Sequence, residues 1–118
     1  MEQVQINKSE KFIALQKAIK RLGDLEQTQR AHDSLLEYAK VQMPGYMSPS
    51  HIKLLASKLE AVERGEIKRL AIFMPPRHGK SQLTSQFFPS WFIGRNPSKY
   101  IIATTYSQDL ADDFGRSV

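Results

Sequence analysis

The stretch Leu70–Ser81, LAIFMPPRHGKS, determines the fold that the sequence predicts. Its first five residues form a continuous apolar run, with charged residues before it and Pro75-Pro76 after it. Such a run is typical of a strand that is buried on both faces, as in a parallel sheet. The residues after the run predict a loop and then a helix from Lys80 to about Ile93, which Pro89 is expected to kink or break.

The flanking sequence extends this pattern in both directions. Downstream, Tyr100–Thr104 (YIIAT) predicts a second strand, and Ser107 is the predicted N-cap of a final helix. Upstream, Ser48 and Pro49 predict the start of a helix that ends at Gly65. Its predicted apolar face consists of Ile52, Leu55, Leu59 and Val62. The order helix, strand, helix, strand, helix predicts an α/β fold with a parallel sheet over residues 46–118.

Residues 1–45 form a separate N-terminal helical segment in this prediction. Ser9 is the expected N-cap of its first helix and Gly23 the expected stop, and a second helical stretch ends before Pro44-Gly45. The apolar face of the first helix consists of Phe12, Leu15, Ile19 and Leu22. The pattern therefore predicts a helical hairpin or one interrupted helix, interpreted as a packing element or an oligomer contact.

Composition limits the classes of protein to which the chain can belong. The 118 residues include 41% hydrophobic and 25% charged residues, which is close to the globular average and unlike a disordered chain. There is no cysteine, which excludes disulfides and thiolate zinc sites. We expect no secretion signal and no membrane span, because the longest apolar run is far shorter than about 20 residues. The net charge of +5 is compatible with a nucleic-acid partner and equally with a solvated surface.

The loop after the first predicted strand resembles a phosphate-binding motif. Against the pattern G-x-x-x-x-G-K-[ST], Gly79, Lys80 and Ser81 match, whereas Met74 stands where the first glycine is expected. Glycine allows the tight turn that points backbone amides at phosphate oxygens, and the helix that follows adds the positive end of its dipole. Lys80 is the expected partner of the β- and γ-phosphates, and the Ser81 hydroxyl is the expected ligand of Mg²⁺.

Other residues of the loop carry less specific expectations. Arg77 is a candidate sensor of the γ-phosphate, with a plain surface arginine as the equal alternative. His78 is expected at the surface, and the three histidines of the chain lie too far apart in sequence to predict a metal site.

A site that hydrolyses ATP also needs an acidic residue at the end of a later strand. Asp109, Asp112 and Asp113 belong to the pattern of the last helix, so we expect them on a solvated face.

Taken together, these residues resemble the large subunit of tailed-phage terminases. The resemblance extends from His51 to Arg116 and is carried by HI (51–52), LEAVERGE (59–66), PPRHGKS (75–81) and ATTYSQDLA (103–111). It implies an additional-strand P-loop ATPase that moves double-stranded DNA into a capsid. It also implies that Pro76–Ser81 hold ATP and Mg²⁺, with Arg77 sensing the γ-phosphate, and that Tyr46 to His51 lie near the adenine.

The resemblance also implies partners and a missing part. The partners are double-stranded DNA, the terminase small subunit, the portal and further copies of the full-length protein, in the cytoplasm of a bacterial host and without a membrane. In terminases the Mg²⁺-binding carboxylate and the nuclease domain lie beyond the position that matches residue 118. We therefore expect the front part of a terminase, binding nucleotide without hydrolysing it alone. The alternatives are a fragment of another P-loop nucleic-acid motor such as a helicase, or a non-catalytic helical interaction module that works through residues 9–43.

Overall fold

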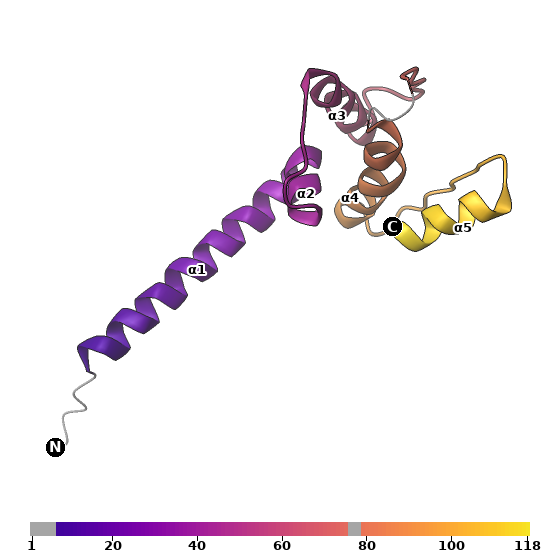
Figure 1. Cartoon of the computed structure of the whole chain (residues 1–118). Coiled ribbons are helices and arrows are strands. Elements are labelled where there is room, and N and C mark those ends of the chain that lie inside the picture. Colours follow the sequence, from indigo (N-terminus) through magenta and orange to yellow (C-terminus); the bar gives the residue numbers. More distant parts are fainter. Residues whose placement is uncertain (1–6, 76–78) are drawn as a thin grey trace.

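The chain forms a small helical body from which one long helix projects (Figure 1). The structure is a computed structural model and describes residues 7–75 and 79–118. Its elements in chain order are α1 (Lys8–Asp33), α2 (Leu35–Gln42), α3 (Ser50–Glu63), the π-helix η1 (Gln82–Phe87), α4 (Phe88–Arg95) and α5 (Gln108–Ser117). None of the helices in these two ranges is long and apolar enough to cross a membrane.

The predicted α/β fold is wrong: in the described parts of the chain there is neither a strand nor a sheet. In the run 70–74, Ile72 and Met74 pack against the helical core, but Phe73 is 92% exposed. In the second run, Tyr100 and Ile102 are 94% and 89% exposed. A strand is stabilised by pairing its backbone with a neighbour, and these runs have no paired neighbour here. The apolar content predicted that both faces of each run are buried. The helices instead cover one face of the first run, and they leave the second run uncovered.

The N-terminal segment is helical as predicted, but its boundaries differ. The side chain of Asn7, rather than that of Ser9, caps α1, accepting a hydrogen bond from the Ser9 amide at 3.4 Å. The helix continues through Gly23 and stops only at Ser34, whose backbone is extended and whose hydroxyl accepts from the Glu37 amide at 3.5 Å. Glycine within a helix costs about 1 kcal/mol, which a long helix tolerates, whereas a side-chain cap ends one helix and starts the next.

The core lies where α2, α3, η1 and α4 meet. Its buried members are Leu35, Ala39, Ile52, Leu55, Ala56, Leu59, Leu83, Phe87 and Trp91. The helical spacing predicted for α3 is confirmed at Ile52, Leu55 and Leu59, which are all buried. This core fixes the position of the turn at Gly79, because Ile52 lies directly against it.

The helix predicted after the glycine loop is composite. Lys80 and Ser81 are helical, the six residues of η1 form a π-helix, and α4 follows at Phe88. Pro89 lies in the first turn of α4, directly after the π-helix η1, so the helix changes type before the proline instead of ending at it. The predicted N-cap of the last helix is confirmed, because the Ser107 hydroxyl accepts from the Leu110 amide at 3.3 Å.

Candidate functional site

Gly79 forms a tight turn at the start of the composite helix. Its φ is +79°, a backbone conformation that side-chain-bearing residues rarely adopt. A Cβ at this position would lie 3.3 Å from Ile52 Cδ1, so the packing also favours glycine. The Gly79 carbonyl accepts a hydrogen bond from the Leu83 amide at 3.2 Å, which brings Lys80 and Ser81 into the first helical turn. This is the local geometry that the glycine of a phosphate-binding loop requires.

A pocket of about 410 Å³ opens beside Gly79. The described residues that line it are Met43, Gly45, Tyr46, Met47, Pro49, His51, Ile52, Gly79 and Gln82. The structure therefore brings together Tyr46, His51 and Gly79, which the resemblance assigned to one nucleotide site. These described lining residues include no Asp or Glu, so none of them repels an anion.

Tyr46 places an unsatisfied polar group near this pocket. Its ring packs edge-on against Phe87 with 5.4 Å between the ring centroids, and its amide donates to the Met43 carbonyl at 3.0 Å. Its hydroxyl is buried and has no hydrogen-bond partner among the described residues. Burial raises the pKa of Tyr46 above its ordinary value of 10.0, so the hydroxyl stays protonated and is available as a donor.

The sequence prediction missed two side chains that lie together at the pocket. Gln82 Nε2 lies 3.5 Å from the sulfur of Met43, which joins the start of η1 to the end of α2. The available signal for Gln82 was its position directly after Ser81, at the start of the helix that follows the predicted motif. Met43 has no comparable signal, since only the folded chain brings it to the pocket.

The remaining predicted site residues fall into two groups. Lys80 is half-buried and Ser81 is exposed, both at the start of the helix. The predictions for Pro76, Arg77 and His78 lie outside the described residues.

No group of three or more His, Cys, Asp or Glu side chains that could hold a metal ion occurs within the described ranges. Asp109 and Asp112 are exposed on α5, where Gln108 Nε2 donates to Asp112 at 2.9 Å. This position agrees with the solvated face expected for them. Ser81 is the residue predicted to bind Mg²⁺, and this stays a prediction.

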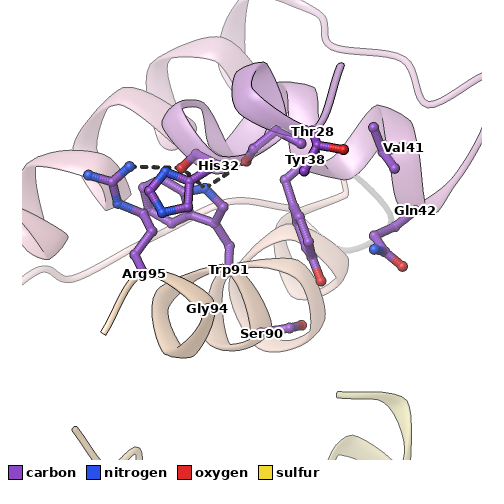
Figure 2. Close-up of a pocket in the computed structure, with 10 residues that line it drawn as sticks. Thr28, His32, Tyr38, Val41, Gln42, Ser90, Trp91, Gly94 and Arg95 are labelled. Carbon is purple, nitrogen blue, oxygen red and sulfur yellow. Dashed lines mark hydrogen bonds between the residues drawn. The ribbon is translucent and has the colours of Figure 1, made fainter. Parts of the chain in front are cut away.

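A second pocket, of about 280 Å³, lies at the junction of α1, α2 and α4 (Figure 2). The Trp91 indole donates to the carbonyls of Ala31 and His32, both at 3.1 Å. Arg95 Nη1 donates to the same His32 carbonyl at 2.7 Å, and its guanidinium lies 5.0 Å from the centre of the Trp91 ring. These hydrogen bonds satisfy backbone carbonyls in the last turn of α1. The junction therefore anchors the long helix to the body.

Comparisons with protein-family models, with curated proteins and with solved structures find no match to this chain.

Proposed function

We propose that the chain binds the phosphate groups of ATP through Gly79–Ser81, as the nucleotide-binding part of a DNA-packaging ATPase of the terminase large-subunit type. The observation that carries the proposal is the left-handed turn at Gly79, which begins a helix beside a pocket lined by Tyr46 and His51. Gly79 of the motif is remote in sequence from Tyr46 and His51, the residues expected near the adenine, and all three line this pocket.

Phosphate recognition follows from the chemistry of the turn. The amides of the first helical turn lack carbonyl partners within the helix, and the helix dipole favours negative charge there. Lys80 adds a positive charge in the same turn. The Ser81 hydroxyl would supply one ligand to a Mg²⁺ ion bound together with the nucleotide, as in other phosphate-binding loops. In this proposal the site depends on the local turn and helix and on no sheet.

The adjoining pocket suits the base of the nucleotide. Its volume lies within the range of about 300–1,000 Å³ that small-molecule sites occupy. Tyr46 and His51 offer aromatic rings for stacking, and Gln82 offers an amide that both donates and accepts hydrogen bonds. We assign the adenine to this pocket and the phosphates to the helix start.

Double-stranded DNA is the translocated substrate in this proposal. The terminase resemblance of residues 51–116 supports it, and the net charge of +5 is compatible with it.

The proposal is tested by titrating the 118-residue chain with Mg·ATP in a calorimeter. Lys80→Ala is expected to abolish measurable binding, because it removes the cation that faces the phosphates. The matched control is Lys58→Ala, which removes the same side chain from an exposed position on α3 and is expected to keep the wild-type affinity. Equal affinities in these two variants would refute the phosphate site.

A second titration separates the two halves of the site. Tyr46→Leu, checked for folding by circular dichroism, is expected to weaken the binding of ATP but to leave the binding of inorganic triphosphate unchanged. If both ligands weaken equally, the adenine does not occupy the pocket at Tyr46.

A further inference from the structure

The long helix α1 exposes an apolar face to solvent. Every residue from Lys8 to Arg30 is exposed, and only Ala31, at the end of the helix, is buried. The exposed side chains include Phe12 at 60%, Leu15 at 59%, Ile19 at 60% and Leu22 at 61%. Figure 1 shows this helix as a rod that leaves the body at its C-terminal end. An isolated helix is marginal in water, so a rod with this composition gains stability from a partner.

The spacing of these residues defines the kind of partner. Phe12, Leu15, Ile19 and Leu22 are separated by three, four and three residues, which is the a/d pattern of a coiled coil. Continuing the pattern by one step in each direction reaches Lys8 at the start and Glu26 near the end. The apolar seam of α1 (these four residues) is thus flanked by a basic position and an acidic position on the same side of the helix.

We propose that α1 pairs with α1 of a second copy of this chain in antiparallel orientation. The seam then forms four apolar layers, in which Phe12 meets Leu22 of the second copy and Leu15 meets Ile19. At each end, Lys8 of one copy meets Glu26 of the other. A parallel pair would instead place Lys8 against Lys8 and Glu26 against Glu26, and like charges in contact destabilise a pair.

The rest of the helix is compatible with this arrangement. The basic side chains in its middle, Lys17, Lys20 and Arg21, lie on the side away from the seam at 100° per residue. The overlap ends at Glu26, and the body begins at Ala31, about 7 Å further along the helix at 1.5 Å per residue. The two bodies therefore lie beyond opposite ends of the pair.

The size of the interface predicts a weak dimer. A Leu, Ile or Phe side chain buries roughly 100 Å² of apolar surface, from 1.5–3 kcal/mol at about 25 cal/mol per Å², so the eight seam side chains bury at most about 800 Å², below the 1,200–2,000 Å² of standard stable interfaces. A dimer with an interface this small is expected to dissociate on dilution. This pairing is independent of the phosphate site.

Sedimentation velocity at about 5 to 500 µM tests the pairing. The wild-type mass is expected to rise from one chain to two, whereas Ile19→Asp stays monomeric. The matched control Ala14→Asp introduces the same charge on the outer side of α1 and is expected to dimerise like the wild type. A wild-type monomer throughout this range, or an assembly larger than two chains, would overturn the proposal.

Charge exchange tests the orientation. Glu26→Lys is expected to weaken the dimer about tenfold, because it breaks both end pairs. The double variant Lys8→Glu/Glu26→Lys restores opposite charges only in the antiparallel pair and is expected to recover the wild-type dissociation constant. If the single variant dimerises like the wild type, the antiparallel assignment is wrong.

Discussion

Arg95 is a residue whose loss should weaken the attachment of α1 to the body. Its Nε donates to Glu63 Oε1 at 3.1 Å, and its Nη1 donates to the His32 carbonyl at 2.7 Å. Its guanidinium also lies over the ring of Trp91 (Figure 2). One side chain therefore joins the end of α1, the end of α3 and the face of α4, and Arg95→Ala removes all three contacts.

The cost of this substitution follows from the burial of Glu63. The Glu63 side chain is only 9% exposed, and without Arg95 its carboxylate keeps one hydrogen bond, from Asn96 Nδ2 at 3.1 Å. A hydrogen bond to a charged group contributes about 1.5–3 kcal/mol, and a cation–π contact about 0.5–1 kcal/mol. These contributions share one side chain and are not additive, so we expect the free energy of unfolding to fall by about 2–3 kcal/mol.

Urea unfolding followed by circular dichroism at low micromolar concentration measures this change. The matched control is Arg30→Ala, which breaks an ion pair with Glu26 at 3.6 Å whose side chains are 69% and 70% exposed. Exposed pairs contribute between zero and about 1 kcal/mol, so this variant should differ little from the wild type. If Arg95→Ala costs no more than Arg30→Ala, the junction does not carry the stability we assign to it.

Three further predictions concern single positions. In Gly79→Ala the added methyl group would lie 3.3 Å from Ile52 in a left-handed backbone. The substitution is therefore expected to lower the free energy of unfolding by about 1–2 kcal/mol, measured by urea unfolding. It is also expected to weaken the binding of ATP, measured by calorimetry. Burial raises the pKa of Glu63, but hydrogen bonds and charge, mainly from Arg95, outweigh it and hold the pKa below 4.5. The stability that Glu63 provides is therefore complete above pH 4.5 and lost as the pH falls through its lowered pKa, and Arg95→Ala should flatten this acid loss in unfolding curves. Leu83→Ala is expected to cost about 2–5 kcal/mol in the same assay, because this fully buried side chain leaves a cavity.

Helix content was predictable where the local sequence decides it. The apolar spacing of α3 and the cap at Ser107 depend on neighbours within one or two turns. The cap is confirmed, and the spacing is confirmed at three of its four positions, with Val62 only half-buried. Gly23 shows the limit of this reasoning, because a glycine stops a helix only where the chain must turn. The chain turns at Ser34 instead, where the amide of Leu35 also finds the Glu60 carboxylate at 3.1 Å, a contact remote in sequence.

The apolar runs were misjudged because burial is a property of the whole fold. In the first run the side chains alternate, with Ile72 and Met74 against the helices and Phe73 in solvent. This is the pattern of a segment covered on one side, although its composition suggested two covered sides. Which sides are covered depends on the elements available to pack there, and these are helices in the described parts of the chain.

At the candidate site, the local sequence predicted one feature, the turn, but not which residues from elsewhere in the chain lie beside it. The turn at Gly79 agrees with the motif Gly79–Ser81, because glycine is the residue of that motif that permits a tight turn with positive φ. Its association with Tyr46 and His51 follows neither from spacing nor from composition, and the resemblance alone suggested it. The packing of Ile52 against Gly79 supplies the physical link, since Ile52 and His51 are neighbours in the first turn of α3. If the proposed site binds nucleotide, a substitution that shifts α3 should therefore alter its affinity without changing Gly79, Lys80 or Ser81.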